Sequence, residues 1–86
     1  MDKQINVAII GTRFMGRAHS TAWSRVSKHF DLALAPVLKV SCGRSKDAHH
    51  QAFAEQFGWE TISDDWERVV NDPDIQIVDI CTSNKS

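Results

Sequence analysis

Several protein classes are excluded by what this 86-residue sequence lacks. Two cysteines are too few for a disulfide scaffold, and no apolar run approaches the ~20 residues that a membrane-spanning helix needs. The sequence shows no signal-peptide pattern at its N-terminus, no internal repeat and no low-complexity tract. Since 42% of the residues are apolar and 24% are charged, the balance is that of an ordinary globular protein. We expect one small cytoplasmic domain that does not span a membrane.

The net charge of −1 conceals two halves of opposite sign. Residues 1–46 hold eight lysine and arginine residues against two acids, which gives +6. Residues 47–86 hold two basic residues against nine acids, which gives −7. A basic first half of this kind can supply a binding site for an anion.

Strand-like and helix-like segments alternate along the chain. Short apolar runs predict strands at residues 5–10, 37–42, 59–62 and 75–81, and helical spacing predicts helices at about residues 15–28, 46–57 and 64–71. Strands and helices that alternate with short connections are typical of a parallel sheet with right-handed crossovers. The sequence therefore predicts an α/β fold, the first half of a Rossmann-like doubly wound sheet, β-α-β-α-β-α-β with strand order 3-2-1-4.

Polar residues at the expected helix ends indicate where each helix starts and stops. Ser45 is expected to cap the second helix, and Ser63 the third. Gly58 is placed for a C-terminal cap of the second helix, and Pro36 marks the end of the connector before the second strand. Acidic residues at 64, 65 and 67 favour stabilisation of a helix dipole over a metal or acid–base site.

The turn at residues 11–16 carries the main chemical signal. In the dinucleotide-binding pattern G-x-G-x-x-G, the first glycine allows the tight turn, the second lets the backbone approach a pyrophosphate, and the third lets the helix pack on the strand. Gly11 and Gly16 hold the first and third positions, and Arg13 stands at the second. Free N–H groups around Phe14 and Met15 would face an anion at the helix N-terminus. Arg13 either fills the pyrophosphate space or pairs with a phosphate from the side, and a turn without any ligand is the third interpretation.

Seven segments together resemble a known family. They are INVAIIGT at residues 5–12, FMGRAH at 14–19, CGR at 42–44, FAEQFG at 53–58, DDW at 64–66, DPDI at 72–75 and VDICT at 78–82. In combination, and over essentially residues 3–84, they resemble the Gfo/Idh/MocA oxidoreductases. That family comprises NAD(P)-dependent dehydrogenases and reductases that act mainly on sugars, inositols and polyols, and pairs an N-terminal Rossmann domain with a C-terminal α/β domain.

The resemblance implies that residues 1–86 form a partial NAD(P)-binding Rossmann domain without the C-terminal substrate domain. The implied cofactor-binding residues are Gly11, Thr12, Arg13, Phe14, Met15, Arg44, Ser45, Thr82 and Asn84. The family usually has glycine in place of Arg13 and commonly has proline in place of Ser83, and its catalytic lysine belongs to a later strand. We therefore expect no catalytic residue and no metal in this chain. It is either the cofactor half of a sugar or polyol oxidoreductase, catalytically incomplete alone, or a non-catalytic nucleotide-binding remnant or sensor.

The end of the second strand bears on the choice of cofactor. A strand that binds NAD usually ends in an acidic residue that contacts the ribose 2′-hydroxyl, whereas this strand ends at Gly43 and is followed by Arg44 and Ser45. Since the guanidinium and the hydroxyl can hold a 2′-phosphate, NADP is favoured over NAD. Asp31 lies at about the right distance in sequence from Gly11 to contact the ribose, but it falls in the connector before the second strand. Alternatively, Arg44 and Lys46 are solvated charges and Ser45 is only a cap.

Other candidate groups are given structural roles. Cys42 and Cys81 end strands that lie two positions apart, about 9–10 Å, which is beyond disulfide reach. His49 and His50 are adjacent on a helix and cannot chelate one metal well, and His19 is expected to be a packing or surface residue. The expected partners are a dinucleotide, a sugar or polyol if the second domain is supplied, and a second copy through the exposed last strand, but not nucleic acid.

Overall fold

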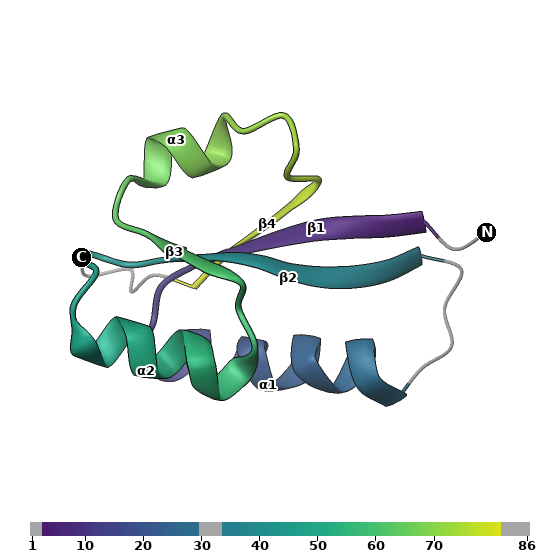
Figure 1. The fold of residues 1–86 in the computed structure, drawn as a ribbon, viewed down its shortest axis with the longest axis horizontal. Coiled ribbons are helices and arrows are strands. Elements are labelled where there is room, and N and C mark those ends of the chain that lie inside the picture. Colours follow the sequence, from purple (N-terminus) through teal and green to yellow (C-terminus); the bar gives the residue numbers. More distant parts are fainter. Residues whose placement is uncertain (1–2, 30–33, 82–86) are drawn as a thin grey trace.

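The computed structural model describes residues 3–29 and 34–81 of the chain (Figure 1). The elements are β1 (Lys3–Ile10), α1 (Phe14–His29), β2 (Leu34–Cys42), α2 (Ala48–Phe57), β3 (Thr61–Ser63), α3 (Trp66–Val70) and β4 (Ile77–Ile80). The four strands are parallel and lie in the order β3-β2-β1-β4. The predicted fold class, element order and strand order are confirmed.

The sheet separates two unequal layers, with α1 and α2 on one face and α3 on the other (Figure 1). Alternate residues of β1 point to opposite faces, as the period of a strand requires. Val7 and Ile9 belong to the larger core, with Phe53 and Trp59, whereas Ala8 belongs to the smaller core beneath α3. Because β1 lies between the two cores, its central residues are fully buried.

Several predicted boundaries are wrong, and among them β4 spans residues 77–80 instead of 75–81. β2 begins at Leu34, so Pro36 lies inside the strand instead of ending the connector. β3 pairs only with residues 40–42 of β2, and a proline that donates no hydrogen bond is tolerated where the neighbouring edge is unpaired. β3 is shifted to residues 61–63, since Trp59 is a buried core residue, and α3 is shorter than expected, at residues 66–70.

The predicted N-caps are also wrong by two residues. The carboxylate of Asp47 accepts the backbone N–H of His50 at 2.9 Å and caps α2, while the Ser45 hydroxyl donates to Asp47 at 2.9 Å. At α3 the cap is Asp65, whose own backbone N–H donates to the hydroxyl of Ser63 at 3.1 Å. In both places the carboxylate takes the position from which the helix N–H groups are reached. The expected C-cap is confirmed, because Gly58 adopts the left-handed conformation with φ of +87°.

Within the described ranges, no helix has both the length and the apolar character that crossing a membrane requires.

Candidate functional site

A cleft of about 470 Å³ lies at the carboxyl ends of β1, β2 and β4. It is lined by residues 10–13 of the β1–α1 turn, by residues 42–45 of the β2–α2 loop and by Cys81 after β4, with Trp66 of α3 at its rim. In the order β3-β2-β1-β4 this is the point at which the chain reverses its direction across the sheet. Open parallel sheets bind their ligands at such a point.

Most of the predicted site residues meet in this cleft. The lining includes Gly11, Thr12, Arg13, Met15, Arg44 and Ser45. Phe14 is the first residue of α1, directly beside the cleft turn. The other two predicted contacts, Thr82 and Asn84, lie outside the described residues.

Gly11 is enclosed by the backbone of three strands. It has φ of +115°, and a Cβ at this position would come within 2.8 Å of the carbonyl oxygen of Cys81. Its N–H donates to the carbonyl of Cys42 at 2.8 Å, and the N–H of Cys81 donates to the carbonyl of Ile10 at 2.7 Å. A side chain here is therefore excluded by conformation and by space.

Gly16 brings α1 close to the end of β1, because a Cβ at Gly16 would overlap the carbonyl group of Gly11. The two glycines thus perform the turn and packing tasks of the dinucleotide pattern. α1 begins beside the cleft and has no acidic residue in its first turn, so no carboxylate on that turn opposes an anion. Arg13, in the middle position of the pattern, has an exposed side chain.

His50 organises the loop that carries Arg44. Its ring is 2% exposed, with Nδ1 2.9 Å from the carbonyl oxygen of Ser45 and Nε2 2.9 Å from the hydroxyl of Ser41. Since a carbonyl only accepts, Nδ1 donates to Ser45, and Nε2 pairs with the hydroxyl of Ser41. A Cβ at Gly43 would lie 3.2 Å from that ring and 3.2 Å from the side chain of Thr12, so a larger residue would fit only if one of these neighbours shifted slightly. Sequence reasoning set His50 aside as a poor metal ligand and missed this role.

The cleft carries charges of both signs. Arg13 and Arg44 are opposed by Asp47 and Asp64, all in the lining. The pKa of Asp47 is lowered, chiefly because its carboxylate accepts the backbone N–H of His50, with a further contribution from the Ser45 hydroxyl. The hydroxyl of Ser45 is thus already engaged, which the sequence did not reveal.

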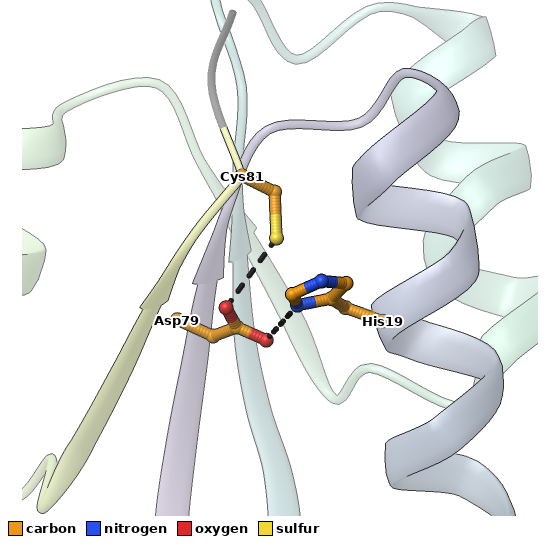
Figure 2. Close-up of side chains that lie close together, drawn as sticks. All are labelled: His19, Asp79 and Cys81. Carbon is orange, nitrogen blue, oxygen red and sulfur yellow. Dashed lines mark hydrogen bonds and ion pairs between the residues drawn. The ribbon is translucent and has the colours of Figure 1, made fainter.

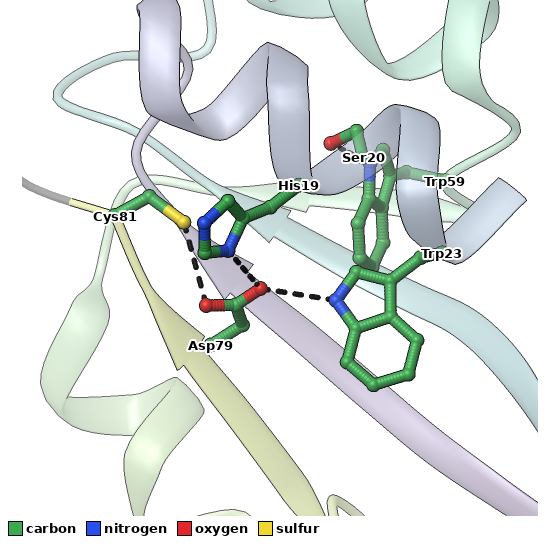
Figure 3. A network of polar contacts seen from close by, with 6 residues as sticks. All are labelled: His19, Ser20, Trp23, Trp59, Asp79 and Cys81. Atoms are coloured by element: carbon green, nitrogen blue, oxygen red, sulfur yellow. Dashed lines mark hydrogen bonds and ion pairs between the residues drawn. The ribbon is translucent and has the colours of Figure 1, made fainter.

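A second polar group lies between α1 and β4 (Figures 2 and 3). One oxygen of Asp79, Oδ2, accepts from His19 Nδ1 at 2.8 Å and from Trp23 Nε1 at 3.0 Å. The other, Oδ1, accepts from the thiol of Cys81 at 3.4 Å. His19 is half-exposed and bonded rather than simply packed, so the sequence missed its partner, which is 60 residues away.

Two pKa values in this group are shifted. Burial acts to raise the pKa of Asp79, but the hydrogen bonds from Trp23, His19 and Cys81 outweigh it, and the pKa falls below its usual value. Burial, together with the negative charge of Asp79, raises the pKa of the Cys81 thiol to about 12. The carboxyl is therefore ionised and the thiol protonated near neutral pH.

The remaining candidates have mainly structural roles. Cys42 and Cys81 are both free, as expected. Trp59 is buried and its Nε1 donates to the hydroxyl of Ser20 on α1 at 3.0 Å (Figure 3). Trp66, by contrast, is 57% exposed at the cleft.

Comparison with known proteins places these features in context. The sequence pattern of an oxidoreductase family with an NAD-binding Rossmann fold matches residues 5–86. The levoglucosan dehydrogenase of Pseudarthrobacter phenanthrenivorans is 41% identical over 83 residues, which are 95% of this chain and 21% of that protein. This chain thus spans about a fifth of the length of that relative.

Solved structures have the same fold over the same part. A levoglucosan dehydrogenase in complex with NADH and levoglucosan superposes with a TM-score of 0.83 and 37% identity, over 95% of this chain and 22% of that one. An NAD binding oxidoreductase from Klebsiella pneumoniae gives a TM-score of 0.83 and 34% identity, over 94% of this chain and 22% of that one.

Proposed function

The chain belongs to the Gfo/Idh/MocA family of oxidoreductases with an NAD-binding Rossmann fold, as its motifs predicted, and we propose that its cleft binds a nicotinamide dinucleotide. The observation that carries the proposal is the geometry of the β1–α1 turn. Gly11 and Gly16 leave no room for side chains, and α1 directs its N-terminus to the cleft without an acidic residue in the first turn. The pyrophosphate would lie against the N–H groups of Phe14 and Met15.

Arg13 is proposed to pair with the pyrophosphate from the side. Its exposed side chain lines the cleft, and its backbone carbonyl accepts the N–H of Arg17, which joins the turn to the start of α1. A guanidinium gives charge-assisted hydrogen bonds to phosphate oxygens, which compensates for the missing middle glycine. The opposite proposal, a weakened site in a non-catalytic sensor, rests on the same residue.

Two cofactors compete at the β2–α2 loop. Arg44 and Ser45 support NADP, because a guanidinium and a hydroxyl suit a 2′-phosphate. Asp47 supports NAD, because its carboxylate lies in the same lining, and an ionised carboxylate there would repel a 2′-phosphate and could accept from a ribose hydroxyl. The structures of levoglucosan dehydrogenase with NADH support NAD for the family. We propose NADP on the strength of Arg44 and make NAD the competing outcome.

For the protein to which this domain contributes, we propose oxidation or reduction of a sugar or polyol, with the substrate domain outside residues 1–86. The relative with levoglucosan bound supports this substrate class. We also propose that the sheet is half of its domain and that the β4 edge is covered by a further strand or a second copy. β4 is the outermost strand of the described sheet, and the exposure of its Ile77 and Ile80, 37% and 64%, supports a covering element on this side.

The cofactor test is a calorimetric titration of the protein with NADPH and with NADH. We expect binding of both and tighter binding of NADPH. Arg44→Gln removes a charge-assisted hydrogen bond and should weaken NADPH at least about tenfold while leaving NADH nearly unchanged. Arg25→Gln, an exposed α1 arginine that is not among the cleft lining, is the matched control.

Equal affinities for NADPH and NADH that do not change in Arg44→Gln would refute the NADP proposal. Tighter binding of NADH than of NADPH would assign NAD as the cofactor. Absence of heat with both at millimolar concentration would refute dinucleotide binding. Sedimentation of Ile80→Lys, compared with the parent protein, tests the edge, since self-association through β4 should be lost in the variant.

A further inference from the structure

Three side chains of different ligand type converge between α1 and β4 (Figure 2). His19 offers a ring nitrogen, Asp79 a carboxylate oxygen and Cys81 a sulfur, and these three atoms all lie within 4.8 Å of one another. The sequence spacing explains the convergence. Asp79 and Cys81 are two residues apart at the end of β4 and therefore point to the same face of the sheet, which α1 covers.

The spacing of these atoms is close to that of a tetrahedral zinc site. Zinc binds nitrogen and oxygen at about 2.0–2.2 Å and sulfur at about 2.3 Å, so neighbouring ligand atoms are roughly 3.3–3.6 Å apart. Here Sγ of Cys81 lies 3.4 Å from Oδ1 of Asp79, and Nδ1 of His19 lies 2.8 Å from Oδ2. These two distances end on different oxygens of Asp79, and one ligand atom from each of the three residues lies within 4.8 Å of the others, so rotation of the side chains would bring them around one ion.

Trp23 holds the carboxylate in place. It lies one helical turn after His19 on α1, and its Nε1 donates to Oδ2 of Asp79 at 3.0 Å (Figure 3). Hydrogen bonds of this kind orient the carboxylate ligands of metal sites. Because Trp23 packs against the larger core, the arrangement is tied to the body of the fold.

We propose that His19, Asp79 and Cys81 bind one zinc ion, with water in the fourth position. The donor set of one nitrogen, one sulfur and one oxygen suits zinc, whereas a single carboxylate beside a thiol does not suit magnesium or calcium. His19 is 41% exposed and Asp79 17%, so the ion can reach the site from solvent.

Binding replaces two hydrogen bonds with bonds to metal. The proton on Nδ1 of neutral His19 moves through solvent to Nε2, which frees Nδ1 as a ligand. The thiol of Cys81 releases its proton to solvent, so one proton leaves for each ion bound. The dipositive ion then balances the carboxylate of Asp79 and the thiolate of Cys81, and no redox step is involved.

The test uses reduced, metal-free protein without nucleotide, so its result is independent of dinucleotide binding. Cobalt(II) serves as the spectroscopic probe and zinc then displaces it. We expect one equivalent of cobalt, a thiolate-to-cobalt charge-transfer band, and bleaching of that band by one equivalent of zinc. X-ray absorption of the zinc form should show one sulfur and three nitrogen or oxygen neighbours.

Variants separate this site from other binding. Cys81→Ser should abolish the charge-transfer band, and Cys42→Ser, the matched control at the protein's other cysteine, should retain it. Trp23→Phe should weaken zinc about 10–100-fold, because the carboxylate loses its orienting donor. Circular dichroism checks that each variant is folded.

A band that survives Cys81→Ser, or that only Cys42→Ser removes, would overturn the proposal. If Cys81→Ser does not fold, the absorption measurement on the unaltered protein still decides. A first shell with no sulfur, or with two, contradicts the assigned ligands.

Discussion

On the β2 side, β1 is paired along its whole length, from Lys3 opposite Leu34 to Ile10 opposite Cys42, whereas on the β4 side it is paired only from Val7 onward. The two faces of the sheet also differ in their packing. The α1 and α2 layer buries large side chains against the sheet, while the layer beneath α3 has a small core of Ala8, Cys42 and Val69.

The β4 side is fixed largely by polar contacts. At one end of β4, Asp79 accepts from His19 and Trp23 of α1. Before β4, the backbone N–H of Asn6 donates to the side chain of Gln76 at 2.7 Å, and the Asn6 amide donates to the carbonyl of Asp74 at 2.8 Å. Hydrogen bonds position a strand accurately but contribute little net stability each, about 0.5–1.5 kcal/mol. The apolar layer of α1 and α2 and the strand β4 are therefore held mainly by different interactions, and a mutation that loosens one should leave the other in place.

The largest expected effect is in the apolar layer. Phe53 is 1% exposed and packs edge-on to Phe57 with 5.1 Å between ring centroids, so Phe53→Ala should lower the free energy of unfolding by about 3–5 kcal/mol. Val69→Ala, in the smaller core, removes the equivalent of two methylenes and should cost about 1–2 kcal/mol.

Urea unfolding followed by tryptophan fluorescence measures both changes, with exposed Gln51→Ala on α2 as a control expected within about 0.5 kcal/mol of the parent. Equal losses for Phe53→Ala and Val69→Ala would mean that the two layers contribute alike and would break the comparison.

An intermediate loss of stability is expected when the carboxylate of Asp79, which holds β4 to α1, is removed. Asp79→Ala leaves the indole N–H of Trp23 and the ring of His19 without their acceptor, which should cost about 1–3 kcal/mol. Hydrogen exchange should accelerate in residues 77–80 and remain slow in α2, because α2 is held by the other core.

Glu67→Ala, an exposed acid on α3, is the control for removal of a carboxylate and should leave exchange in β4 unchanged. Uniform acceleration throughout the chain in Asp79→Ala would show that the two sides open together, contrary to the comparison.

The parts that the sequence predicted correctly depend on local pattern. Strand and helix periodicity, with short connections, gave the order β3-β2-β1-β4, and the glycines at 11 and 16 located the cleft turn. The prediction at Pro36 was wrong because a strand tolerates proline where its neighbouring edge is unpaired. Whether that edge is paired depends on a distant strand and cannot be read from the residues around Pro36. The caps shifted from Ser45 to Asp47 because serine and aspartate compete within one turn and backbone geometry decides.

The polar groups around the cleft were missed for a different reason. His19 and Asp79 are 60 residues apart and meet only because α1 crosses over β4. The alternation in residues 77–81 does place Asp79 on the helix-covered face with Cys81, which was the one available signal. His50 gave a similar clue, since it lies three and four residues before Phe53 and Ala54 and so on the same inner face of α2.

The smallest expected effect is a loss of stability at low pH at the start of α2, where Asp47 caps the helix. Because the pKa of Asp47 is lowered in the folded protein, its contribution to stability is complete above the unfolded value of about 3.9 and is lost as the pH falls through the lower folded pKa. Asp47 is exposed and the α2 layer is held by apolar packing, so the loss should be small and confined to the start of α2. Asp47→Asn keeps an oxygen that accepts from the His50 N–H but does not titrate. Its melting temperature between pH 5 and pH 2 should therefore fall less steeply than that of the parent, and parallel curves would show that the cap carries no charge-dependent stability.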